Sequence, residues 1–150
     1  MILFTTSRKP VQSSRSLARL MAKLIPYSEY ITRGKMGIEK LAEVARTKGY
    51  ETVCIISESH GNPSAFMFLK TFPETRWEQK IEFRVKELKK IKKPSKSILV
   101  QGTDSEKFKT LFNIQEEEEG GTVVITDKEK WIFKTDEGEI ITIYIGGAKK

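Results

Sequence analysis

The chain has 150 residues, of which 38% are hydrophobic and 31% charged, and 27 Lys and Arg against 20 Asp and Glu give a formal net charge of +7. This length is usual for one domain, or for two small halves that share a core. No apolar run approaches the roughly 20 residues of a membrane-spanning helix, no signal-peptide pattern opens the sequence, and a lone cysteine, Cys54, excludes an internal disulfide. We therefore expect a cytoplasmic protein with no membrane partner.

The positive charge favours a polyanionic partner, and nucleic acid is the commonest one. Two alternatives stay open at this point. The charge could serve only solubility, and the high Lys and Glu content also fits a thermophile.

The first elements in the chain are a short strand and an amphipathic helix. Residues 2–6 are apolar strand formers, and Pro10 lacks the N–H that a continuing strand needs. Ser13 is the expected N-cap of the helix, and Pro26 ends it. Its apolar face is predicted from i, i+3, i+4 spacing and consists of Leu17, Leu20, Met21, Leu24 and Ile25.

The opposite face of this helix carries a cationic stripe. Arg15, Arg19 and Lys23 follow one another at i, i+4 and i+8. Like charges at this spacing repel, and the helix dipole disfavours a cation in the first turn. A sequence selected for stability alone would place Asp or Glu there, so the stripe indicates a function.

The middle of the chain predicts one more helix among several strands. We expect a strand at 27–32, a helix at 36–48, a fully buried strand at 51–57 and a strand at 65–72 that Pro73 ends. The segment "HGNPS" between the last two is a turn that contains the only histidine, His60. "KIEFRVKEL" (80–88) alternates apolar and charged residues as a half-buried strand does, and the alternative helix would expose Phe83.

After a basic linker at 89–96 the opening pattern returns. "ILVQGTDSEKFKTLF" again reads as strand, hydroxyl-bearing turn and helix, with Thr103 or Asp104 as the cap. Strands are predicted at 122–126, 130–134 and 139–145, with the hairpin turn "TDEG" before the last. The sequence thus predicts an α/β (α+β) fold in which two similar halves, about 1–88 and 97–147, form a pseudo-repeat within one domain spanning 1–150.

The turn between the first strand and the first helix is the best candidate site. Hydroxyls and guanidinium groups bind phosphate oxygens, and a helix N-terminus favours anions. The glycines of a P-loop are absent, so an exposed polymer backbone fits this turn better than a buried mononucleotide. The expected phosphate contacts are Thr6, Ser7, Arg8, Lys9, Ser14, Arg15, Arg19 and Lys23.

No other part of the sequence predicts a catalytic, metal or cofactor site. One histidine and one cysteine cannot supply a usual zinc site. The acidic run Glu116, Glu117, Glu118, Glu119 is interpreted as a solvated loop, although it could also repel RNA or meet a basic protein. Trp131 and Phe133 share a strand face, and core packing is favoured over a stacking platform for RNA bases.

The opening stretch "TTSRKPVQSSRSLARLMAKLIP" resembles the signature of Brix-domain proteins, especially the short archaeal ones. "GNPSAFMFLKTF" and "GGTVVITDKEKWIFKTDEG" resemble later family segments in the same order. The resemblance implies a ribosome-biogenesis factor that binds ribosomal RNA, and two α/β halves that are each like the anticodon-binding domain of class II aminoacyl-tRNA synthetases. Members often have Pro-Ser-x-Arg-Thr-Arg in the turn, whereas this chain has "PVQSSR", with Ser13 in place of a cation.

The prediction from the sequence is therefore a non-enzymatic RNA-binding factor in ribosome biogenesis. Its expected partner is ribosomal RNA or its precursor, with other ribosome-assembly proteins as further candidates. A small phosphate- or nucleotide-binding enzyme and a protein-interaction scaffold with a basic face are the alternatives.

Overall fold

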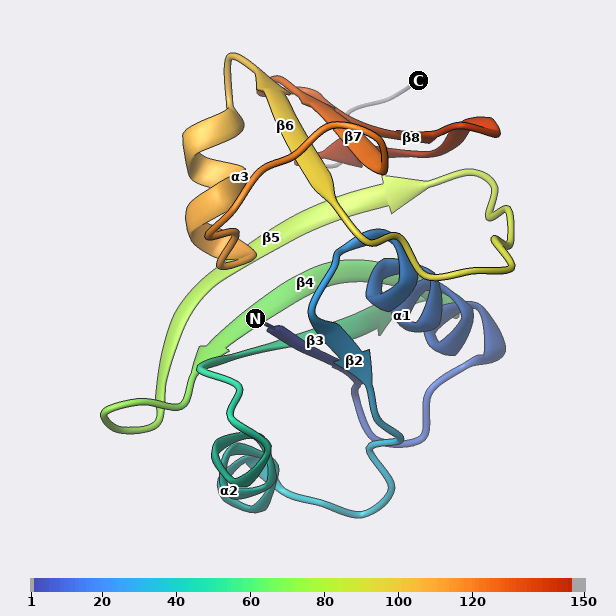
Figure 1. The fold of residues 1–150 in the computed structure, drawn as a ribbon. Coiled ribbons are helices and arrows are strands. Elements are labelled where there is room, and N and C mark those ends of the chain that lie inside the picture. The colour runs from blue at the N-terminus through green and yellow to red at the C-terminus, as the bar shows by residue number, and fades with distance from the viewer. Residues whose placement is uncertain (1, 147–150) are drawn as a thin grey trace.

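The computed structural model describes residues 2–146. Within them, three helices and nine strands follow one another along the chain (Figure 1). In chain order they are β1 (Ile2–Thr6), α1 (Gln12–Leu24), β2 (Ser28–Tyr30), α2 (Ile38–Lys48), β3 (Thr52–Ser59), β4 (Asn62–Lys70), β5 (Arg76–Val85), β6 (Ile98–Gly102), α3 (Ser105–Leu111), β7 (Thr122–Thr126), β8 (Lys130–Thr135) and β9 (Gly138–Ile145). The mixed α/β class predicted from the sequence is confirmed.

All nine strands belong to one sheet, in the order β2-β1-β3-β4-β5-β9-β8-β7-β6. β5 and β9 meet at the centre as an antiparallel pair, with Phe83 opposite Ile145. On one side, β5 pairs antiparallel with β4, β4 antiparallel with β3, and β3 parallel with β1. The other side repeats this pattern: β9 pairs antiparallel with β8, β8 antiparallel with β7, and β7 parallel with β6. β2 and α2 have no counterpart among the described residues of the second half, which end at residue 146.

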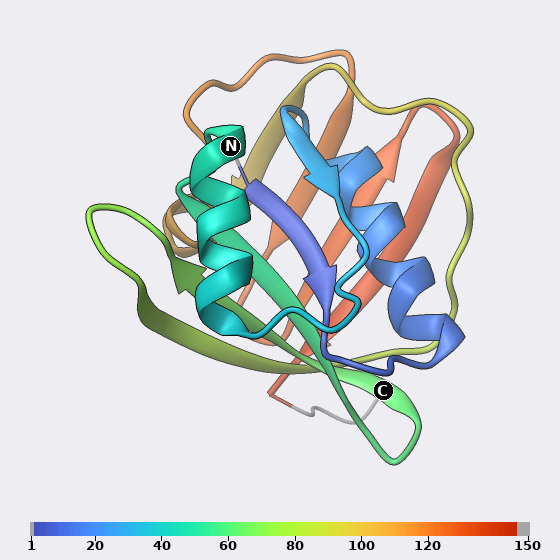
Figure 2. The same cartoon turned by 90° about the horizontal axis from the view of Figure 1, so that it is seen from below.

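The helices cover both faces of the sheet. Because successive side chains of a strand point to opposite faces, Phe4 packs with α1 and α3 while its neighbour Leu3 packs with α2. Figure 2 shows α1 and α2 as separate helices beside β1. The larger core, between α1, α3 and the sheet, contains side chains from both halves of the chain.

Aromatic rings fill the centre of this larger core. The ring of Phe66 on β4 lies 4.3 Å from that of Phe83, 5.8 Å from Phe112 and 6.2 Å from Trp131, measured between centroids. Trp131 and Phe133 are fully buried, so the core interpretation of these two residues is confirmed and the stacking platform for RNA is wrong. The shared rings fix the first half of the chain against the second.

Several predicted boundaries shift in the structure. The predicted strand over 80–88 is found as far as Val85, but 86–88 lie outside it, and β5 begins earlier, at Arg76. The turn predicted over "HGNPS" contains only His60 and Gly61, with φ of 53° and 76°, and β4 already starts at Asn62. Two positive φ values match the twist of a hairpin, which lets the strands continue to the turn itself. β2 and α2 are shorter than predicted, at Ser28–Tyr30 and Ile38–Lys48.

Candidate nucleic-acid interface

The turn after β1 presents two cations to solvent. Ser7 donates its backbone N–H to the carbonyl of Ile56 at 3.1 Å, which holds the chain beside β3 for one residue beyond β1. Arg8 and Lys9 then lie exposed. Lys9 has a φ of 54°, a left-handed conformation that turns the chain toward α1. The turn predicted from the sequence therefore places Arg8 and Lys9 at the surface, with Ser7 half-buried beside them.

A carboxylate from another strand holds the start of α1. Glu58 Oε2, on β3, accepts hydrogen bonds from the backbone N–H of Val11 at 3.0 Å and from the Ser14 hydroxyl at 2.8 Å. The expected N-cap, Ser13, is wrong: Val11 occupies the N-cap position and its side chain makes no cap hydrogen bond. A negative charge at a helix N-terminus is favourable, so Glu58 does what a local cap residue would do.

Two of the expected phosphate contacts lie beneath the surface. Ser14 is fully buried, with its hydroxyl held by Glu58, and Thr6 is 1% exposed. The backbone carbonyl of Thr6 accepts a hydrogen bond from Arg33 Nη1 at 3.1 Å. In this conformation neither side chain reaches solvent, so both support the turn from below.

The outer face of α1 carries the predicted stripe. Arg15 folds back over the first turn and donates to the Pro10 carbonyl at 3.1 Å and to Gln12 Oε1 at 3.3 Å. Arg19 is exposed, with its guanidinium carbon 5.1 Å from the centroid of the Tyr30 ring. Arg15 thus connects the cationic turn to the helix, and Arg19 continues the positive surface one turn further.

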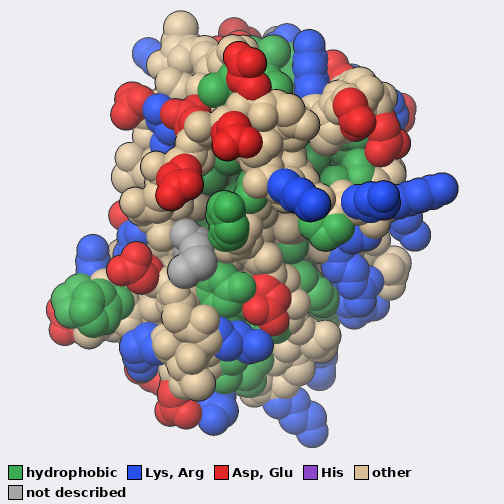
Figure 3. Space-filling view, viewed as in Figure 1, with side chains coloured by type: hydrophobic (Ala, Val, Ile, Leu, Met, Phe, Trp, Pro, Cys, Tyr) green, Lys and Arg blue, Asp and Glu red, His purple; other side chains and the backbone are tan. Residues whose placement is uncertain are grey.

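Lys23, the last residue of the stripe, joins α1 to the basic linker. Its ammonium group donates to the Ile91 carbonyl at 3.1 Å, and its own carbonyl accepts from the Ser95 N–H at 2.7 Å. The linker passes beside α1 in both ribbon views (Figures 1 and 2). Figure 3 shows Lys and Arg side chains gathered over the linker and α1. The linker residues 92, 93 and 96 are exposed lysines.

Arg33 adds a cation that the sequence reasoning missed. It is 6% exposed and donates from Nε to the Met36 carbonyl at 2.7 Å as well as to Thr6. Burial, and secondly the charge of Arg8, lower the pKa of Arg33. Positive charge is therefore concentrated where the turn leaves β1. No sequence signal identifies Arg33, because its position depends on the backbone before α2.

Two other kinds of feature are absent from residues 2–146. In the part of the chain that the structure describes, no three His, Cys, Asp or Glu side chains come together as ligands for a metal ion. None of the described helices has the length and apolar character that crossing a bilayer requires.

Comparisons with known proteins identify relatives in archaea. No protein-family model matches the chain. It is 32% identical over 117 residues to a probable Brix domain-containing ribosomal biogenesis protein of Methanosarcina barkeri. This alignment covers 76% of this chain and 72% of the relative. It is 42% identical over 74 residues to the protein of the same name in Pyrococcus horikoshii, where the match spans 49% of this chain and 33% of the relative. The chain thus matches about a third of the length of the Pyrococcus protein.

Solved structures agree over nearly the full length. A probable ribosomal biogenesis protein from Aeropyrum pernix K1 has a TM-score of 0.74 at 20% identity and covers 99% of this chain and 97% of its own. Mil, an archaeal Imp4-like protein, has a TM-score of 0.68 at 29% identity, with 95% of both chains covered. With the Methanosarcina alignment, these matches confirm the predicted resemblance, and the chain belongs to the Brix domain-containing ribosomal biogenesis proteins.

Proposed function

We propose that the chain acts in ribosome biogenesis by binding ribosomal RNA or its precursor, without catalysing a reaction. Membership of the family supports the process, ribosome biogenesis, and the basic surface suggests that the partner is RNA. The contacts we propose come from the turn, from the outer face of α1 and from the linker: Ser7, Arg8, Lys9, Arg15, Arg19, Lys92, Lys93 and Lys96. Thr6, Ser14 and Lys23 hold these segments in place from beneath.

The observation that carries this proposal is the attachment of the linker to α1. The two hydrogen bonds between Lys23 and the linker hold the linker beside the last turn of α1, and the cationic turn lies at the first, so we infer one cationic surface along the helix. Arg15 and Arg19 are about 6 Å apart along the helix axis, at about 1.5 Å per residue. Such a surface suits the repeated charges of a nucleic-acid backbone better than a single small anion.

We also infer that the two halves of the chain arose from one α/β unit. The support is the shared order of elements: β1 and α1 match β6 and α3, and both halves continue with one parallel and two antiparallel pairings. Each unit would then correspond to the anticodon-binding domain of class II aminoacyl-tRNA synthetases, an RNA-binding relative. A superposition of β6–β9 on β1, β3, β4 and β5 that left α3 away from α1 would overturn this inference.

Binding to a fragment of archaeal ribosomal RNA across a salt series tests the proposed function. Phosphate contacts release counterions, so the logarithm of affinity should fall linearly with the logarithm of salt concentration. The double variant Arg8→Ala, Arg19→Ala should bind more weakly and lower the slope by roughly 0.7 to 0.9 per lost contact.

The matched control removes two exposed cations elsewhere, Lys107 on α3 and Lys128 in the β7–β8 turn. Lys107→Ala, Lys128→Ala makes the same change in net charge and should keep the parental slope. Equal effects of the two double variants would show a response to net charge alone. Affinity that does not change with salt would exclude a grip on the backbone.

A further inference from the structure

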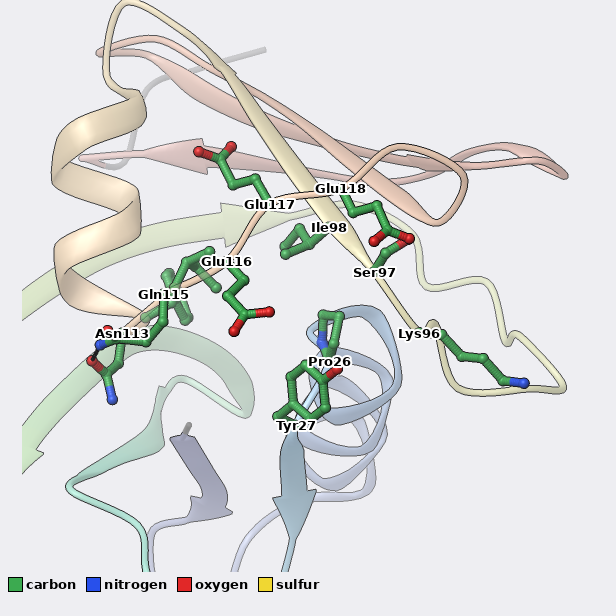
Figure 4. Close-up of a pocket in the computed structure, with 12 residues that line it drawn as sticks. Pro26, Tyr27, Lys96, Ser97, Ile98, Asn113, Gln115, Glu116, Glu117 and Glu118 are labelled. Carbon is green, nitrogen blue, oxygen red and sulfur yellow. Dashed lines mark hydrogen bonds between the residues drawn. The ribbon is translucent and has the colours of Figure 1, made fainter.

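A cavity of ≈ 480 Å³ lies between the turn that follows α1 and the segment that follows α3 (Figure 4). Pro26 and Tyr27 form one side, Ile98 on β6 lies between the two sides, and residues 113–118 form the other side. Its volume is within the range of sites that bind ligands or side chains of a partner. Of the proposed RNA contacts, those at the turn and on α1 do not line it, whereas Lys96 on the linker does.

The segment at 113–118 is held firmly against the sheet. Glu117 accepts from the Val100 N–H at 2.8 Å and from Lys109 at 3.1 Å, and the Glu118 N–H donates to the Ile98 carbonyl at 3.0 Å. β6 is the last strand of the sheet, so these bonds satisfy an otherwise open edge. The acidic run expected to be a solvated loop is in part a fixed wall of the cavity.

The neighbouring carboxylates stay available. Among residues 2–146, no hydrogen bond or ion pair holds the carboxylate of Glu116 or Glu118. Figure 4 shows Glu116 directed toward the Pro26–Tyr27 turn, whereas the ammonium group of Lys96 points away from the cavity. Figure 3 shows acidic side chains on the upper part of the same face. The rim is therefore negative in a chain whose net charge is +7.

Tyr27 supplies an aromatic surface opposite Glu116, whereas the Glu118 carboxylate lies beside Ser97 (Figure 4). Its side chain is 71% exposed, the highest value among the large hydrophobic residues that are exposed in the described chain. Its φ of 58° is uncommon for a bulky residue, and such positions favour Gly or Asn. A large ring at a costly position, left in solvent beside a cavity, points to a contact that the isolated chain does not make.

We propose that this cavity binds an extended, arginine-bearing segment of a protein partner. A guanidinium group can stack on the Tyr27 ring while donating to the carboxylate of Glu116, and its aliphatic stem can pack on Ile98. A further arginine of the same segment can pair with Glu118. Lysine would use the same charges without the planar stacking. The negative rim repels RNA, so a basic protein and the RNA backbone occupy different surfaces of the chain, which adjoin at Lys96.

An octapeptide of alternating arginine and glycine serves as the probe, titrated into the ¹⁵N-labelled full chain. Chemical-shift changes should concentrate at Tyr27, Ile98 and residues 113–118, and a glutamate–glycine peptide should cause none there. The double variant Glu116→Gln, Glu118→Gln should weaken binding about fivefold, as the loss of exposed ion pairs allows. Tyr27→Ala should weaken it about threefold, whereas Tyr27→Phe keeps the ring and the affinity.

The matched control is Glu39→Gln, Glu74→Gln, which neutralises two exposed carboxylates outside the cavity and should retain parental affinity. Equal weakening by both double variants, or shift changes spread over all acidic residues, would overturn the proposal. Shift changes at these residues when the ribosomal RNA fragment alone is titrated into the chain would also overturn it, because RNA would then be the occupant. Loss of RNA binding in Arg8→Ala, Arg19→Ala with peptide binding intact separates this test from that of the proposed function.

Discussion

The hydroxyl of Ser14 donates to the carboxylate of Glu58 at 2.8 Å, and this contact joins the first turn of α1 to the end of β3. The same carboxylate oxygen accepts the Val11 N–H at 3.0 Å. One side chain thus satisfies two donors at the start of the helix and fixes the direction in which the Arg8–Lys9 turn leaves the sheet.

Glu58→Ala should lower the free energy of unfolding by about 2 kcal/mol, because a buried hydroxyl and a backbone N–H both lose their acceptor. Ser13→Ala should change it by no more than about 0.5 kcal/mol, since Ser13 does not cap the helix. Urea unfolding of both variants measures the difference. A larger loss for Ser13→Ala would mean that the local hydroxyl, and not Glu58, caps α1 in solution.

Substitutions at two adjacent residues of α1, Arg19 and Leu20, should affect RNA binding and stability separately. Leu20 is 5% exposed, so Leu20→Ala should cost ~2–5 kcal/mol of stability by leaving a cavity in the core. Arg19 is exposed, and Arg19→Ala should change stability by about 0.5 kcal/mol while weakening RNA binding. Urea unfolding and RNA titration of each variant provide the comparison. An Arg19→Ala protein that binds RNA like the parent would remove the α1 stripe from the interface.

The free energy of unfolding should depend on pH through the carboxylate of Glu117. The hydrogen bond from the Val100 N–H, aided by Lys109, lowers the pKa of Glu117 below its ordinary value of 4.5. The carboxylate therefore stabilises the fold at pH values above 4.5, and this contribution is lost as the pH falls through the lowered pKa. Glu117→Gln should be less stable than the parent by about 1 kcal/mol at pH 7, with the difference narrowing in acid.

Urea unfolding at a series of pH values from 7 downward measures this effect. Glu119→Gln is the control. Within the described part of the chain, the exposed Glu119 contributes only its backbone carbonyl to a hydrogen bond, at 3.5 Å from Ser97 Oγ. A parent and a Glu117→Gln variant whose stabilities differ equally at all pH values would contradict the assigned role.

Cys54 should report unfolding. It is fully buried, and burial raises the pKa of its thiol, so the reactive thiolate is suppressed in the folded chain. Iodoacetamide should label the native protein far more slowly than the urea-unfolded protein, with a rate that follows the unfolded fraction. Rapid labelling in native buffer would show that β3 opens without global unfolding.

The elements that carry local signals were predictable. β1, α1 and β6 follow from apolar spacing and from Pro10 and Pro26, and the turn cations were identified from residue type alone. The role of Glu58 was not predictable, because its partners lie on a helix far away in sequence. The same holds for Arg33 and for the bond from Lys23 to the linker, which depend on tertiary packing. Ser14 and Arg15 were both expected phosphate contacts from their residue types. Only their burial in the structure shows that Ser14 lies beneath the surface, whereas Arg15 lies on the outer face of α1.

The aromatic contacts between the halves have a consequence during synthesis. Ribosomes release the N-terminal half first, so Phe66 and Phe68 are made before the rings of Phe112 and Trp131 that cover them in the finished chain. A nascent chain that ends at the linker therefore presents an uncovered aromatic face and has incomplete packing. A fragment truncated there should aggregate, and the basic surface on α1 should reach its final form only after the second half has emerged.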